Sequence, residues 1–124
     1  MAAAKLDFYL EQGTDFLRKL IFQDSTPALE DLTGQTFRGQ IRKSISDSTI
    51  VVAFTFTILN QLTNKGEVTF SLTNAQTSSI VLKPQNVVTR EAQEFAYDIE
   101  REFTDGRVER VIEGVIKVSP EVTR

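Results

Sequence analysis

Cysteine, histidine and tryptophan are all missing from this chain of 124 residues. Without cysteine, neither disulfides nor thiolate metal sites can form. Without histidine, there is no imidazole general base, no Ser-His pair and no common zinc ligand set. These absences remove the most common catalytic constellations, so we expect no enzymatic activity, no metal and no cofactor.

Strong charge of one sign and long apolar runs are missing as well. The formal net charge is −3 and the pI is close to 5.0, which disfavours binding to a phosphate backbone, so we expect no nucleic-acid partner. No apolar run approaches the roughly 20 residues of a membrane helix, and Lys5 and Asp7 interrupt the start of the chain. We therefore expect a soluble chain, made without export and without a membrane partner.

What is present is ordinary globular composition. Hydrophobic residues make up 40% and charged residues 25%, which argues against disorder, and the length suits one domain. No repeat or linker divides the chain. We expect a single domain over 1–124, with 1–4 and 119–124 as arms that become ordered on docking.

An alternation of apolar and polar residues with a period of two dominates the chain and predicts strands. Residues 16–22 also match helical spacing, but their aromatic and branched content favours a strand. The first strand is expected to place Leu6, Phe8 and Leu10 inward. The predicted strands are 4–10, 16–22, 36–43, 49–59, 67–72, 94–103 and 108–118.

The inward positions of the last two predicted strands follow from the same alternation. The inward residues are Phe95, Tyr97 and Ile99 on one strand, and Ile112, Gly114, Ile116 and Val118 on the other.

Between the strands, turn and cap residues predict the connections. Thr73 or Asn74 can cap one short helical turn near 73–80, with Gln76 in its first turn. Pro84 excludes a central strand, so 83–94 is predicted to be an exposed, mobile loop. Gly106 in "TDGR" predicts a hairpin. Together these signals indicate an all-β antiparallel sandwich or barrel of seven or eight strands.

Five acidic residues gather around the last hairpin and are the nearest approach to a site. They could form a cation site or a surface for a basic partner, but a solvated sheet face is the favoured interpretation. Neighbouring arginines can pair with several of these carboxylates. The acidic residues are Asp98, Glu100, Glu102, Glu109 and Glu113.

The register of this hairpin decides which charges face each other. A two-residue turn would place Glu102 opposite Glu109, which is unfavourable for like charges. A longer turn would place Glu102 opposite Arg107, and we favour it. The residues predicted to form an interface are Glu100, Glu102, Arg107, Glu109 and Arg110.

Hydroxyl residues are abundant in "SISDSTI" and "TNAQTSSI", but no histidine base is present to activate them. We interpret them as turn and cap residues.

Four segments occur in an order that resembles small proteins of tailed-phage structural gene clusters. They are "FYLEQGTDFLRKLIFQD", "DLTGQTFRGQIRKS", "VTFSLTNAQTSSI" and "FAYDIEREFTDGRVERVIEGVIKVSPEVTR". The shared features are a Gln-Gly break, a Leu-Thr-Gly turn before "RGQIR", a "SLT" segment and a final "EG" to "PEVTR" stretch. The resemblance spans about Phe8 to Arg124.

Two departures from that family stand out. The family has a short Gly-containing "GRY" stretch where this chain has "NVVTREAQEFAYD", and Arg101 replaces a residue that is usually apolar. The resemblance implies an immunoglobulin-like β-sandwich similar to the N-terminal domain of phage baseplate upper proteins. It also implies a virion structural role without catalysis.

Three hypotheses follow. The first is a tail or baseplate adaptor that attaches a fibre or spike. It would be made in the host cytoplasm and located in the virion, as a homo-oligomer in the assembled particle, with tail, baseplate or fibre subunits as partners. The second is a head decoration or cement protein on the capsid. The third, ranked below these, is a carbohydrate-binding β-sandwich; only Tyr9 and Tyr97 could act as aromatic platforms, and Tyr97 is expected in the core.

Overall fold

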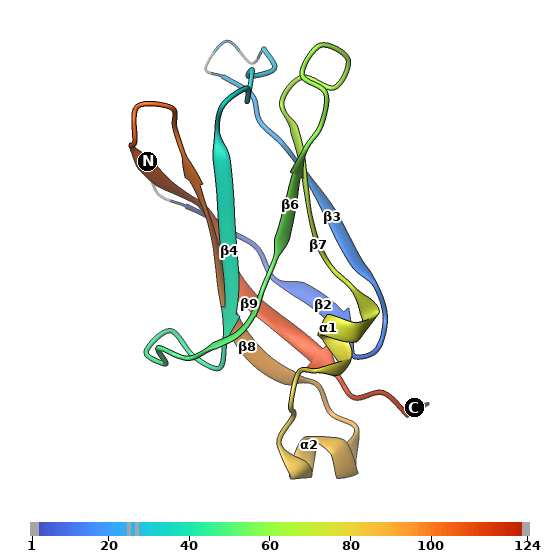
Figure 1. The fold of residues 1–124 in the computed structure, drawn as a ribbon. Coiled ribbons are helices and arrows are strands. Elements are labelled where there is room, and N and C mark those ends of the chain that lie inside the picture. The colour runs from blue at the N-terminus through green and yellow to red at the C-terminus, as the bar shows by residue number, and fades with distance from the viewer. Residues whose placement is uncertain (1–2, 25, 27, 123–124) are drawn as a thin grey trace.

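The computed structural model describes residues 3–24, 26 and 28–122, and within them nine strands and two short helices form two layers (Figure 1). In the larger sheet the order is β1-β9-β8-β4-β5, with β2 also paired to β9; in the smaller sheet it is β3-β7-β6. Strands dominate and most pairs are antiparallel, which confirms the expected all-β class. The elements are β1 (Ala4–Lys5), β2 (Phe8–Glu11), β3 (Phe16–Ile21), β4 (Thr36–Arg42), β5 (Ile50–Ala53), β6 (Thr55–Ile58), β7 (Glu67–Leu72), α1 (Asn74–Ser78), α2 (Pro84–Thr89), β8 (Gln93–Glu102) and β9 (Val108–Ser119).

Aromatic rings from both sheets meet in one core. The ring centroids of Phe54 and Phe70 lie 5.2 Å apart, and those of Phe8 and Tyr97 lie 5.5 Å apart. Phe8 also meets Phe70 edge-on at 5.7 Å, a favourable geometry for aromatic pairs. The two layers therefore share one set of buried contacts. The predicted strand over 16–22, rather than a helix, is confirmed by β3.

The predicted single strand over 49–59 is wrong, because the chain changes sheets in its middle. β5 pairs with β4 in the larger sheet, whereas β6 pairs with β7 in the smaller one. Between them Phe54 is buried, and its N–H donates to the carbonyl of Gly39 at 3.0 Å. An added Cβ at Gly39 would lie 3.1 Å from the Phe54 ring. The buried ring of Phe54 therefore marks the point where the chain passes from the larger sheet to the smaller one.

The N-terminal edge is interrupted at Leu6 and Asp7. The Asp7 carboxylate accepts from the N–H of Val115 at 3.0 Å, and Leu6 is 46% exposed, so its predicted inward position is wrong. The Tyr97 hydroxyl donates to the Leu6 carbonyl. That carbonyl lies where a Cβ of Gly114 would be, so only glycine fits there. β1 and β2 therefore lie along β9 as one interrupted edge.

Parts of both predicted arms belong to the sandwich. Ala4 lies in β1 and Ser119 lies in β9. The N–H of Glu121 donates to the Gln12 side chain at 3.0 Å. Residues 1–2 and 123–124 lie outside the described residues.

The predicted helical turn is confirmed by α1, which closes one end of the sandwich. Thr73 and Gln76 form a capping box. Thr77 is fully buried; its hydroxyl accepts from the N–H of Gly13 at 3.0 Å and donates to the carbonyl of Thr14 at 2.8 Å. The β2–β3 turn is thus bonded directly to the helix.

Residues 83–94 are not the irregular loop that Pro84 predicted, because they contain α2. Pro84 occupies the first turn of this helix, where its missing N–H costs nothing. Arg90 ends the helix in the left-handed conformation at φ 62°. None of the α2 residues is buried, and Figure 1 shows the helix projecting from the end of the sandwich.

Both predicted registers for the last hairpin are wrong. Glu102 faces Val108 and Arg101 faces Glu109, and the N–H of Phe103 donates to the carbonyl of Arg107 at 2.8 Å. A register shift follows between Ile99 and Glu100. The observed pairing brings opposite charges together at Arg101 and Glu109, which either predicted register would have missed.

Candidate functional site

A groove of about 520 Å³, lined by both charged and apolar groups, lies on the outer face of the larger sheet. Three cationic and three anionic side chains line it, so their formal charges cancel. Its floor includes the small residues Ala96 and Gly114. The charged lining residues are Lys5, Asp7, Arg42, Asp98, Arg110 and Glu113.

Arg110 holds two acidic residues together on this face. Asp98 and Glu113 face each other across β8 and β9, a pairing that is unfavourable for like charges. The Arg110 guanidinium lies 3.4 Å from the Asp98 carboxylate and 3.2 Å from that of Glu113. Burial raises the pKa of the Asp98 carboxyl; Arg110 opposes this, while Glu100 and Glu113 add to it. The arginine therefore offsets a repulsion built into the register.

Other polar groups of the groove are also engaged with protein atoms. Arg42 donates to the Gln40 side chain at 2.9 Å and to the carbonyl of Asp47 at 3.1 Å. Lys5 lies 3.8 Å from Glu113. Several charged side chains of the groove are thus engaged with neighbouring protein atoms.

The five predicted interface residues do not form one cluster. Glu100 and Arg110 face each other on the outer side of the sheet, and Glu100 pairs with Arg38 at 2.9 Å. Glu102 accepts weakly from Thr36 at 3.4 Å. The other two predicted residues point elsewhere: Arg107 pairs with Asp105 in the exposed turn at 2.9 Å, and Glu109 pairs with Arg101 at 3.3 Å.

Arg101 is the buried charge that the predicted site left out. It is only 8% exposed and lies 2.7 Å from the Glu30 carboxylate. Its guanidinium is 4.7 Å from the ring centre of Phe22 and 4.5 Å from that of Phe103. The alternation of β8 could have revealed it, because position 101 has the same parity as the inward residues of that strand.

The acidic cluster does not assemble into a cation site in the described part of the chain. There, no group of three or more suitable side chains lies in a metal-binding arrangement. Glu100, Glu109 and Glu113 are each ion-paired with an arginine. Their carboxylates thus serve the sheet's own charge network.

The hydroxyl-rich segments serve turns and caps, as interpreted from the sequence. Thr73 accepts from the N–H of Gln76 at 3.2 Å. In the other segment, Asp47 accepts from the N–H of Thr49 at 2.8 Å, and the hydroxyls of Ser44 and Ser46 lie 3.2 Å apart.

Comparison with known proteins finds no match to any family model and no similar curated sequence. Neither short helix in the described part of the chain combines the length and apolarity that a membrane crossing needs.

Proposed function

We propose that the chain is a non-enzymatic structural protein of a tailed-phage virion, a tail or baseplate adaptor that attaches a fibre or spike. The resemblance of its ordered motifs, from about Phe8 to Arg124, is the source of this proposal. An immunoglobulin-like topology is part of it. Two mostly antiparallel sheets that share one aromatic core support that topology.

The observation that carries the proposal is that three of the motifs meet in space. The Gln-Gly break, the "SLT" segment and the final "PEVTR" stretch lie far apart in sequence. In the structure, Gln12 donates to the carbonyl of Ile80 at 2.8 Å and accepts from the N–H of Glu121 at 3.0 Å. Gly13 donates to Thr77. Motifs that are weak separately thus describe one clasp, which supports their being signatures of a shared fold.

The groove supports a contact role over a catalytic one. Four of its six charged groups (Lys5, Asp98, Arg110 and Glu113) are paired with one another, and the formal charges of the six cancel. A surface of this kind suits specific packing between protein subunits, where complementary charges select the partner. In a symmetric particle, many weak contacts of this type add up through avidity.

The experiment is to purify particles of the virus that encodes this chain, quantify the chain by mass spectrometry and locate it by cryo-electron microscopy. We expect density at the tail or baseplate and a copy number in the tens or fewer. Hundreds of copies on the capsid would favour the head decoration hypothesis instead. Absence of the chain from purified particles would overturn the virion role.

Only one of the two tyrosines that could stack on a sugar ring is exposed in the structure. Tyr97 is 4% exposed, whereas Tyr9 is 69% exposed and lies near Lys117, whose ammonium is 5.5 Å from the ring centre. A single exposed tyrosine is a poor platform for a sugar ring. Micromolar binding on a glycan array would restore this hypothesis.

A further inference from the structure

The turn between β8 and β9 contains the only aspartate of the sequence that is followed by glycine, Asp105 with Gly106. Gly106 has a φ of 91°, and no atom of the described residues beyond its chain neighbours lies within 4 Å of the place where a Cβ would stand. The side chain of Asp105 is 59% exposed. Because glycine has no side chain to obstruct its own nitrogen, the aspartyl carboxyl can approach that nitrogen more easily here than at the other aspartates.

An aspartate that precedes glycine can react with its own backbone without an enzyme. The Gly106 nitrogen attacks Cγ of the neutral Asp105 carboxyl; the N–Cγ bond forms, the Cγ–OH bond breaks, and the hydroxyl leaves as water with the proton of the nitrogen. Water then opens the resulting succinimide ring. Opening at Cγ restores aspartate, whereas opening at the α-carbonyl gives isoaspartate, in which the main chain runs through Cβ and Cγ. Water leaves in the first step and returns in the second, so no other reactant is needed.

We propose that Asp105 is a site of isoaspartate formation and that the side chain of Arg107 slows the reaction. The Arg107 N–H donates to one oxygen of the Asp105 carboxylate at 3.0 Å, and Arg107 Nε donates to the other at 2.9 Å. The attacking nitrogen is also engaged, because the Gly106 N–H donates to the carbonyl of Phe103 at 3.0 Å. These bonds must open before the nitrogen can reach Cγ. The folded turn therefore restrains both reacting groups.

Arg107 is itself held in place in the turn. Its guanidinium lies 4.5 Å from the ring centre of Phe103, within the range of a cation–π contact. The same ring centre lies 4.5 Å from the guanidinium of Arg101, which is buried. The bonds from the N–H and the side chain of Arg107 also lower the pKa of Asp105, so less of its carboxyl is in the neutral form that can lose water. Geometry and charge thus act in the same direction.

Isomerisation would alter the end of the hairpin, because isoaspartate adds one carbon to the main chain of the turn. Two bonds close the turn at its present length. The N–H of Phe103 donates to the carbonyl of Arg107 at 2.8 Å, and the N–H of Gly106 donates back to the carbonyl of Phe103. The added carbon would lie close to the pairing of Arg101 with Glu109 on β8 and β9. This inference is separate from the virion role, because the reaction depends only on the turn.

The first experiment is incubation of the purified chain at neutral pH and body temperature for several weeks. Tryptic peptides are then analysed by mass spectrometry with electron-transfer fragmentation, which distinguishes isoaspartate from aspartate. We expect isoaspartate at Asp105 and not at the other aspartates. Arg107→Gln should raise its rate of formation by about threefold, an effect of the size that one exposed ion pair can have. Absence of isoaspartate at Asp105 in Arg107→Gln as well as in the wild type would overturn the proposal.

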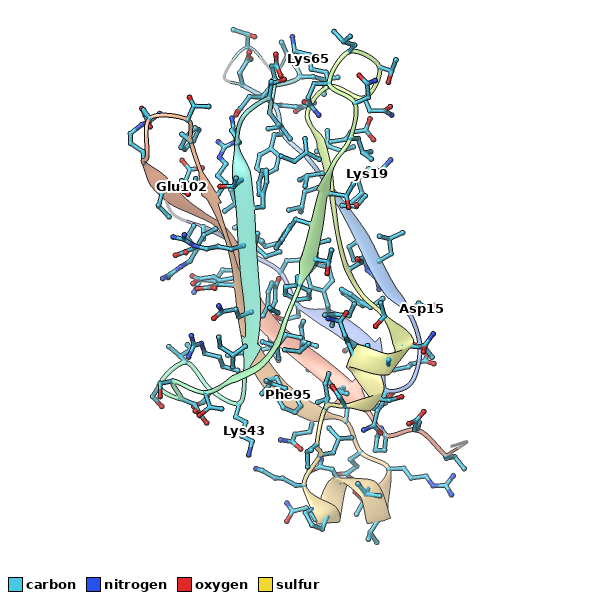
Figure 2. The ribbon with its side chains drawn as sticks, in the orientation of Figure 1. Asp15, Lys19, Lys43, Lys65, Phe95 and Glu102 are labelled. Atoms are coloured by element: carbon cyan, nitrogen blue, oxygen red, sulfur yellow. The ribbon has the colours of Figure 1, made fainter. Side chains whose placement is uncertain are left out.

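Lys43→Gln is the matched control, since it also removes one positive charge at an exposed position. Figure 2 shows Lys43 at the other end of the larger sheet from Glu102, the last residue of β8 before the turn. The rate at Asp105 should stay unchanged in this control, and an increase equal to that of Arg107→Gln would overturn the role of Arg107. In urea, where the turn is unfolded, the wild type and Arg107→Gln should react at the same, higher rate. A difference that persists in urea would mean that the folded turn is not what restrains the reaction.

The second experiment separates the isomerised fraction by chromatography and measures its amide hydrogen exchange. We expect the amides of Phe103 and Gly106 to exchange faster than in the unmodified chain, whereas those of β3 and β7, in the other sheet, stay unchanged. Unchanged exchange at both turn amides would overturn the inferred change at the end of the hairpin. Circular dichroism checks that Arg107→Gln and Lys43→Gln are folded.

Discussion

At the scale of single residues, charged side chains on the sheets are held by partners from distant parts of the chain. Arg101 on β8 bonds to Glu30 in a loop and to Glu109 on β9. Arg110 links Asp98 to Glu113. Half-buried ions of this kind contribute little as pairs, but removal of one member leaves the other without compensation. Mutation of an arginine that pairs with two carboxylates at a half-buried site should therefore lower the free energy of unfolding more than mutation of an exposed arginine.

Arg101→Ala is expected to lower the free energy of unfolding by about 3 kcal/mol, because it leaves Glu30 and Glu109 unpaired at a half-buried site. Urea unfolding followed by circular dichroism measures this change. Arg107→Ala is the matched control: its pair with Asp105 is exposed, so the loss of stability should be much smaller than for Arg101→Ala. Equal losses in the two variants would show that Arg101 does not organise this site.

Asp98→Asn should change the dependence of stability on pH. Burial raises the pKa of Asp98 above its ordinary value of 3.8, so the folded state holds this proton more tightly than the unfolded state. The contribution of Asp98 therefore falls as the pH rises through that raised pKa. The melting temperature of Asp98→Asn should exceed that of the wild type more at pH 7 than at pH 3.

The opposite sign is expected for Asp105→Asn, the control for that pH series. Hydrogen bonds from the N–H and side chain of Arg107 lower the pKa of Asp105. Its carboxylate therefore stabilises the fold at pH values above the pKa that Asp105 has in the unfolded chain. This contribution is lost as the pH falls through the lower pKa of the folded state. If the melting temperatures of both variants changed with pH in parallel with that of the wild type, neither carboxyl group would have the shifted pKa that we assign to it.

At the scale of elements, α1 and α2 show how similar short helices depend on different contacts. α1 has a capping box, and its buried Thr77 bonds to the β2–β3 turn. α2 has no buried residue and no side-chain cap at its first residue. Short helices are marginal in water without tertiary contacts. The sequence predicts α1 through its cap residues, whereas Pro84 at the start of α2 is equally compatible with a loop and with the first turn of a helix.

Thr77→Val should destabilise the protein by roughly 2 kcal/mol, because the Gly13 N–H and the Thr14 carbonyl lose their partner in a buried place. Thr89→Val in α2 removes a threonine hydroxyl that, on the surface, donates to the carbonyl of Gln85 at 2.9 Å and accepts from the N–H of Glu91 at 3.4 Å. It should change stability by less than about 0.5 kcal/mol. Thermal unfolding of both variants tests this. Similar losses of stability would mean that the bonds of Thr77 to the β2–β3 turn do not stabilise the fold.

At the scale of the whole molecule, one aromatic core joins the two sheets. Phe70 of the smaller sheet meets Phe8 and Phe54 at 5.7 and 5.2 Å, and both of these rings contact Tyr97 of the larger sheet. The layers have no separate cores, so they should unfold in one cooperative step. This expectation does not depend on the proposed function.

Phe70→Ala is expected to lower the free energy of unfolding by about 4 kcal/mol, through lost burial and the cavity left between the sheets. The near-ultraviolet signal of Tyr97 and the far-ultraviolet signal of the strands should disappear together in urea. Val88→Ala, at an exposed position of α2, is the control and should have almost no effect. Two separate transitions in Phe70→Ala would mean that the sheets fold independently.

The sequence by itself determined which segments are extended, the cap of α1 and the turn at Gly106, because these depend on local alternation and on residues a few positions apart. The tertiary structure alone decided the crossover at Phe54, the parallel pairing of β2 with β9 and the register that places Arg101 opposite Glu109. The physical reason is that period-two patterns state which face of a strand is buried, but not which strand lies beside it. Partner and register are chosen by contacts between residues far apart in the chain, such as Phe54 with Gly39 and Tyr97 with Leu6.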